Sequence, residues 1–150
     1  MTRLTMLATA AAAALSIAGT AEAAKPSLQQ DQRAIAILNV LNTTFTNDCY
    51  AGNSYACAGK SYVRDIGGYM WAASEACDNG NDTACNQYEQ AYRELENAYT
   101  RISYHFDLVG FGECGLSWSA AKPRIRGWST GWNGNAYDAW DHNQFISYIS

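Results

Sequence analysis

The chain has 150 residues, of which 10 are basic and 14 are acidic, and its net charge is −4 at neutral pH. An acidic chain lacks the positive surface that non-specific nucleic-acid binding requires. After residue 23, no stretch of the sequence provides the roughly 18 to 20 continuous apolar residues of a membrane-spanning helix. The 10 tyrosines and the low content of lysine and arginine favour one compact domain over a disordered chain.

The first 23 residues have the composition of an export signal. Arg3 precedes an apolar, alanine-rich run over residues 4–19, and an Ala-Glu-Ala sequence that ends at Ala23 fits a signal-peptidase site. We expect cleavage after Ala23, with residues 24–150 forming a single helical domain that is periplasmic or extracellular. The competing interpretation of the first 23 residues is a buried alanine-rich helix.

The spacing of apolar residues predicts a first helix over residues 27–46. Ser27 and Gln30 fit a capping box at its start. Its apolar face consists of Ala34, Ile37, Leu38, Leu41 and Phe45. We therefore expect this helix to bury one side.

A second helix is predicted over residues 57–77. Its apolar residues are Val63, Ile66, Met70 and Ala73. Gly67 and Gly68 lie inside this helix, where two glycines cost about 2 kcal/mol relative to alanine. They could bend the helix or divide it into two shorter ones.

The third predicted helix, over residues 83–108, has the clearest amphipathic pattern. Its apolar stripe consists of Tyr88, Ala91, Tyr92, Leu95, Tyr99, Ile102 and Phe106. Asp82 or Thr83 is the expected N-cap. Glu89 and Arg93 are spaced for an ion pair on the exposed side, which we interpret as a solvated face and not as a site.

Two nine-residue segments, Cys49 to Cys57 and Cys77 to Cys85, share the pattern Cys-x-x-Gly-Asn-x-x-Ala-Cys. Their agreement indicates a duplicated unit, and Gly-Asn is typical of a turn. If the intervening residues form one helix, its rise of about 1.5 Å per residue separates Cys57 from Cys77 by about 30 Å, too far for a disulfide. The other cross-pairings also span an antiparallel array. We therefore expect Cys49 to pair with Cys57, and Cys77 with Cys85.

This cysteine spacing, with an internal glycine and a preceding amphipathic helix over Ala73 to Cys77, resembles the disulfide-bonded Sel1-like repeats of secreted bacterial cysteine-rich proteins. The resemblance covers about residues 45–90. The chain departs from that family after Cys57 and Cys85, where the family's Leu-Gly is not matched. The resemblance implies a TPR-like protein-binding or structural role and carries no catalytic residues.

The composition changes at Gly110, since 6 of the 12 glycines and 4 of the 5 tryptophans lie between Gly110 and Trp140. We expect residues 110–150 to wrap around the helices as an irregular segment, with a short helical stretch over 136–149. Its aromatic and amide residues either pack against the helices or form a glycan-binding surface. They are Trp128, Trp132, Asn133, Tyr137 and Trp140. A basic patch nearby either holds an anion or is a solvated loop. It consists of Lys122, Arg124 and Arg126.

Few residues could carry chemistry, and no catalytic residues, metal or cofactor are predicted. His105 and His142 lack metal-ligand spacing, and the segment 78–82 lacks the glutamate that closes a calcium loop. Cys114 has no partner in the two pairs, so it is either a free thiol or a link between two copies of the chain in a homodimer. The neighbouring Glu113 disfavours a reactive thiolate.

The sequence therefore predicts an all-α domain, a small antiparallel three-helix array with two local disulfides and an irregular Trp/Gly-rich C-terminal segment. The leading functional hypothesis is a secreted or periplasmic protein-interaction or structural module. Its partner would be another protein or a cell-envelope glycan. The alternatives are a glycan-binding module that uses the C-terminal tryptophans, and a small cell-wall hydrolase.

Overall fold

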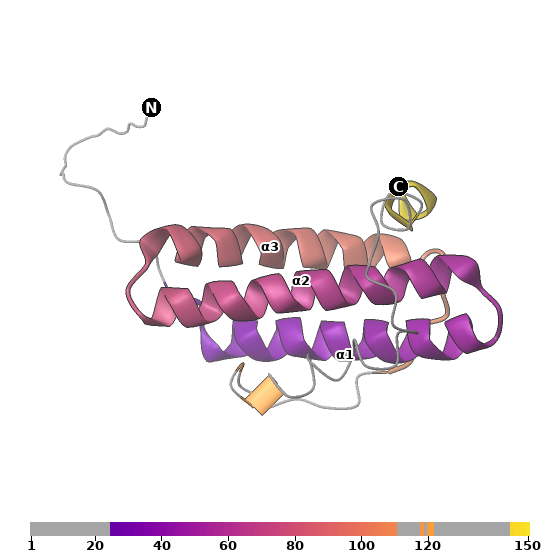
Figure 1. The fold of residues 1–150 in the computed structure, drawn as a ribbon, viewed down its shortest axis with the longest axis horizontal. Coiled ribbons are helices and arrows are strands. Elements are labelled where there is room, and N and C mark those ends of the chain that lie inside the picture. The colour runs from indigo at the N-terminus through magenta and orange to yellow at the C-terminus, as the bar shows by residue number, and fades with distance from the viewer. Residues whose placement is uncertain (1–24, 111–117, 119, 122–144) are drawn as a thin grey trace.

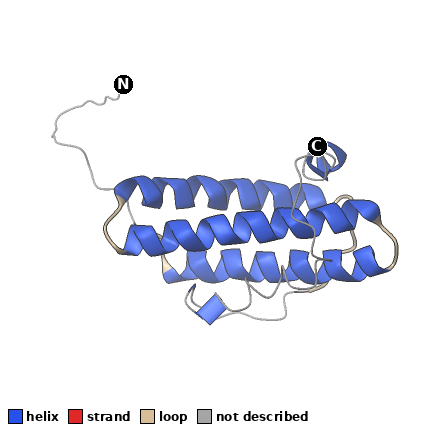
Figure 2. Ribbon diagram, viewed as in Figure 1, coloured by secondary structure: helices blue, strands red, loops and turns tan. Residues whose placement is uncertain are grey.

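The computed structural model describes residues 25–110, 118, 120–121 and 145–150. Three long helices run antiparallel and side by side: α1 (Leu28–Tyr50), α2 (Ser54–Asp78) and α3 (Asp82–Ile102) (Figure 1). Among the described residues, all regular structure is helical (Figure 2). The structure therefore confirms the predicted all-α, three-helix array.

Both predicted disulfides are present, one at each end of the bundle. Cys49 bonds to Cys57 at the α1–α2 corner, and Cys77 bonds to Cys85 at the α2–α3 corner. The Cα atoms are 4.7 Å apart in both pairs. Each disulfide therefore fastens the last turn of one helix to the first turn of the next.

The corner between α1 and α2 shows why the cysteine pattern contains Gly-Asn. Gly52 has a φ of 101°, which is the left-handed conformation that glycine adopts at the end of a helix. The Asn53 N–H then donates to the carbonyl of Asp48 at 2.9 Å, which closes α1. The Asn53 side chain in turn accepts hydrogen bonds from the N–H groups of Tyr55 and Ala56, so it is the N-cap of α2.

The corner between α2 and α3 repeats this arrangement. Gly80 has a φ of 96°, and the Asn81 N–H donates to the carbonyl of Ala76 at 3.0 Å. Asn81 Oδ1 accepts from the Ala84 N–H and caps α3. Glycine thus ends one helix, and the asparagine after it begins the next. The two corners share one backbone geometry, whereas their origin by duplication stays a prediction.

The helices extend further into the corners than the sequence pattern predicted. α1 continues to Tyr50 instead of ending near residue 46, and α2 begins at Ser54 instead of at residue 57. The cap of α3 is Asn81, so the prediction of Asp82 or Thr83 was wrong. The helices extend further for the same reason at both corners: the turn between them contains only the glycine and its two neighbours. The cysteines therefore lie inside helical turns.

α3 ends at Ile102 and not at residue 108 as expected. The N–H groups of His105 and Phe106 both donate to the Ile102 carbonyl, which tightens the chain into turns. The Val109 N–H then donates to the Thr44 side chain at 3.1 Å, so the chain leaves α3 toward α1. Phe106 remains buried although it lies outside the helix.

Gly67 and Gly68 do not divide α2, which is one helix of 25 residues. α1 also differs from the expected one-sided pattern, because residues 34–38 are all buried. Part of its remaining surface is covered by Trp118, which contacts Asp31 of α1 and Tyr88 of α3. A helix with so wide an apolar surface requires such cover.

The C-terminal residues return to the end of the bundle that holds the Cys49–Cys57 disulfide (Figure 1). Phe145 is completely buried there, with ring centroids 5.3 Å from Phe45, 5.4 Å from Tyr62 and 6.5 Å from Phe106. Residues from four separate parts of the chain thus form one aromatic cluster. We call it the end cluster.

Candidate functional site

The predicted binding residues Trp128, Trp132, Asn133, Tyr137 and Trp140 lie outside the described residues, and so does Cys114. Their roles stay predictions. In the described part of the chain, no group of three or more His, Cys, Asp or Glu side chains could hold a metal ion. None of its helices is both long enough and apolar enough to cross a lipid bilayer.

A buried polar cluster joins α1, α3 and Trp118. The Tyr88 hydroxyl donates to Asp31 Oδ1 at 2.6 Å, and Trp118 Nε1 lies 3.0 Å from the same oxygen and 2.8 Å from the Tyr88 hydroxyl. Burial raises the pKa of Asp31, although the hydrogen bonds from Tyr88 and Trp118 act in the opposite direction. Tyr88 and Trp118 are themselves buried, so this cluster fastens structure together and offers no opening to a ligand.

A second set of polar contacts follows the exposed edge between α1 and α3. Gln30 donates to Glu89 at 2.9 Å, and Arg33 forms an ion pair with Glu96 at 3.1 Å. Arg93 pairs with Glu89 on the same helix, as its spacing predicted. The hydrogen bond from Gln30 and the charge of Arg93 lower the pKa of Glu89. Exposed pairs of this kind contribute up to about 1 kcal/mol each, and only the contacts of Gln30 and Arg33 connect the two helices.

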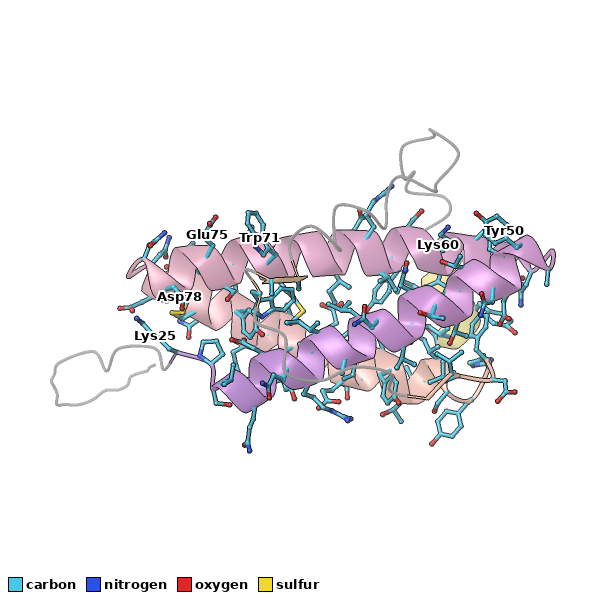
Figure 3. All side chains as sticks on the ribbon, turned by 90° about the horizontal axis from the view of Figure 1, so that it is seen from below. Lys25, Tyr50, Lys60, Trp71, Glu75 and Asp78 are labelled. Atoms are coloured by element: carbon cyan, nitrogen blue, oxygen red, sulfur yellow. A yellow bond between two sulfur atoms is a disulfide. The ribbon has the colours of Figure 1, made fainter. Side chains whose placement is uncertain are left out.

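Two further surfaces lie on α2 (Figure 3). Lys60 is only 7% exposed, and its ammonium lies 5.6 Å from the centre of the Tyr50 ring. Burial lowers the pKa of this lysine. Trp71 and Glu75 are one turn apart on α2, toward its other end (Figure 3).

A groove between α2 and α3 is the best candidate site. It has a volume of about 290 Å³. Its lining residues are Tyr62, Asp65, Ile66, Tyr69, Gln87, Gln90, Ala91 and Glu94. Ile66 and Ala91 are buried and form its apolar inner surface, whereas Tyr69 is 49% exposed and forms part of the rim.

Helical spacing explains how this groove forms. On α2, Tyr62, Asp65, Ile66 and Tyr69 follow one another at intervals that keep them on one side of the helix. On α3, positions 87, 90, 91 and 94 do the same. These two stripes border the buried face of each helix, so packing brings them opposite each other. The corner capped by Asn81 and the Cys77–Cys85 disulfide join these two helices at one end.

The groove has a negative electrostatic character. It is lined by two carboxylates, Asp65 and Glu94, and by no basic residue. Burial raises the pKa of the Tyr62 hydroxyl, and the charge of Glu94 raises it further, so the Glu94 carboxylate acts on the interior of the groove. Arg64 contacts Asp65 Oδ1 at 3.1 Å but does not line the groove.

Glu94 lines the α2–α3 groove, whereas Glu96 pairs with Arg33 of α1, so the two face different sides of the bundle. His105 is exposed, and its ring lies 4.8 Å from that of Tyr148. The signal that could have found the groove is the pair of aromatic and polar stripes along the edges of the two helices.

Comparison with protein families, curated proteins and solved structures gave no match to this chain.

Proposed function

We propose that this protein is an exported protein-interaction module that contacts its partner through the α2–α3 groove. The groove carries this proposal, because it is open at the surface and combines tyrosine rings with an apolar interior and a polar rim. Protein interfaces are enriched in tyrosine and place polar residues around an apolar centre. The Cys77–Cys85 disulfide joins the two helices that form it, and Cys49–Cys57 joins α2 to α1.

Two properties of the chain support export. Residues 1–23 have the pattern of a signal peptide, and disulfides form and persist mainly in oxidising compartments. The resemblance of residues 45–90 to Sel1-like repeats supports a protein-binding role. The proposed location is the periplasm or the extracellular space.

Site-specific crosslinking tests the interaction surface. A photoreactive phenylalanine at Gln87, in the groove, is compared with the same group at Asn97, an exposed position on α3 outside it. In periplasmic or secreted material from the source cells, we expect a discrete crosslinked protein from the Gln87 position and none from Asn97. No crosslinked product at Gln87, or equal products at both positions, would contradict the proposal.

A glycan-binding role is the second candidate, and the clustering of Trp128, Trp132 and Trp140 in the sequence favours it. Aromatic rings stack on the apolar faces of sugars, while neighbouring Asn and Asp side chains bind hydroxyl groups. Tryptophan fluorescence, measured against a panel of cell-wall sugars and polysaccharides, tests this role. An unchanged spectrum across the panel would remove it.

A further inference from the structure

We infer that the α2–α3 groove receives an arginine or lysine side chain of the partner. This inference rests on the proposed function and names the chemical class that the groove recognises. The carboxylates come from different helices, Asp65 from α2 and Glu94 from α3, and both line the same cavity. No basic residue lines it, so a cation entering the groove meets the negative charge of Glu94 and that of Asp65, whose Oδ1 also contacts Arg64.

The aromatic lining supports the same class of ligand. Tyr69 is half exposed at the rim, and tyrosine rings attract lysine and arginine cations that lie over their faces. Gln87 and Gln90 are exposed beside it and present amide oxygens that accept hydrogen bonds from guanidinium or ammonium groups. The rim can therefore satisfy the several N–H donors of an arginine.

The interior of the groove fits the rest of such a side chain. Ile66 and Ala91 are buried there and offer an apolar surface to the methylene groups of lysine or arginine. A volume of about 290 Å³ lies at the lower limit for sites that enclose a drug-sized ligand. It suits one long side chain inserted from a partner.

The charge of the whole bundle favours the same partner. Residues 25–110 contain ten acidic and six basic residues, so a basic protein surface is attracted to the bundle before it docks. An anionic ligand would be repelled by Asp65 and Glu94. Arg64 contacts Asp65 through Oδ1 alone among the described residues, and Glu94 forms no ion pair there.

NMR titration of the full chain tests the inference, because it detects weak binding at known residues. The probes are N-acetyl-arginine amide, N-acetyl-lysine amide and the neutral isostere N-acetyl-citrulline amide. We expect the two cations to shift the amide signals of the groove residues in a saturable way, and citrulline amide to leave them unchanged. Glu94→Gln and Asp65→Asn should each weaken arginine binding by about threefold. Glu75→Gln, an exposed position on α2 outside the groove, is the matched control and should not change it.

Three results would overturn the inference. Equal shifts with citrulline amide would show that charge is not recognised. Equal weakening by Glu75→Gln and Glu94→Gln would show diffuse attraction without a site. The third result combines two observations. Replacement of Lys122, Arg124 and Arg126 by glutamine would shift the amide signals of the groove residues, and arginine amide would not. The groove would then bind the chain's own basic segment.

The failures of this inference and of the proposed function are distinguishable. If a partner crosslinks through Gln87 but neither arginine amide nor lysine amide binds, the proposed protein-interaction function is supported. The inference that the groove receives a cationic side chain is then refuted. Saturable arginine binding without a crosslinked partner supports the cation site and contradicts the protein-interaction module.

Discussion

Gly59 is required by close packing and not by a turn. A Cβ atom at this position would lie 2.7 Å from Phe45 Cδ2 and 2.9 Å from Phe145 Cε1, both of them ring atoms of the end cluster. Forcing such a contact costs about 1 to 3 kcal/mol, which exceeds the gain of about 1 kcal/mol in helix propensity. We expect Gly59→Ala to lower the free energy of unfolding, measured by urea denaturation.

Gly68 is the matched control for that substitution, because it lies in the same helix and a Cβ atom there would meet nothing within 4 Å. Gly68→Ala should raise the free energy of unfolding by up to about 1 kcal/mol. If the two substitutions shift stability in the same direction, close packing does not explain Gly59.

Asp31 gives the stability of the protein a dependence on pH. Burial raises its pKa above the ordinary value of 3.8, and the charge of Asp78 acts in the same direction. The folded state therefore holds the proton more tightly than the unfolded chain does, so ionisation of Asp31 disfavours folding. As the pH rises from 3.8 through the raised pKa, the contribution of Asp31 to the free energy of unfolding should fall.

Urea denaturation across this pH range, with Asp31→Asn as the comparison, isolates the effect. The substitution keeps an oxygen that can accept from Tyr88 and Trp118 but removes the titration, so the decline assigned to Asp31 should disappear. Tyr88→Phe removes a hydrogen bond that lowers the pKa of Asp31, and the decline should then extend to higher pH. An identical pH profile in the parent and in Asp31→Asn would refute this assignment.

At the scale of the helices, the two corners should differ in their resistance to reduction. Cys77 and Cys85 are 0% and 3% exposed, whereas Cys49 and Cys57 are only partly buried. Because a thiolate must reach the disulfide to reduce it, we expect limiting dithiothreitol to open Cys49–Cys57 first. Mass spectrometry after alkylation measures the order. The reverse order would show that exposure in the folded state does not control access.

Removing either disulfide should also destabilise the bundle. Each closes a short loop, and the entropic model assigns about 2.5 kcal/mol to a loop of this length. Urea denaturation measures the loss in free energy of unfolding for each disulfide. The two double variants are Cys49→Ala with Cys57→Ala, and Cys77→Ala with Cys85→Ala. The second should lose more, because its two cysteines are more deeply buried and removal of their sulfur atoms leaves a cavity. Unchanged stability in either variant would contradict this account.

The helices and disulfides could be predicted because their signals are local. Apolar spacing marked the three helices, and the length of the middle helix left only the local cysteine pairing. The boundaries were less accurate, because residues 46–50 and 54–56 lack apolar spacing and become helical through the corner caps at Gly52 and Asn53. The stripes that line the groove are visible in the sequence, but that they face each other depends on how α2 and α3 are rotated, which apolar spacing alone does not determine.

At the scale of the whole molecule, contacts between residues distant in sequence join the segment after α3 to the bundle. The spacing of apolar residues within a helix does not predict them. Val109 binds to Thr44, Trp118 to Asp31, and Phe145 packs on Phe45. These contacts explain why α1 is buried on more than the one predicted face. They also imply that the chain beyond α3 shares its core with the bundle, and the two should therefore unfold together.

Phe145 provides the test of this shared core, because its ring is fully buried in the end cluster while only a short helix carries it. Phe145→Ala should lower the free energy of unfolding by about 3 to 5 kcal/mol, since the cavity would lie among Phe45, Phe106 and Tyr62. Ser147→Ala, an exposed position in the same short helix, should change it by less than about 0.5 kcal/mol. Urea unfolding, monitored by circular dichroism and by tryptophan fluorescence, measures the stability of both variants. In the parent protein the two signals should change at the same urea concentration. A Phe145→Ala protein as stable as Ser147→Ala would mean that the three helices hold the fold without the C-terminal residues.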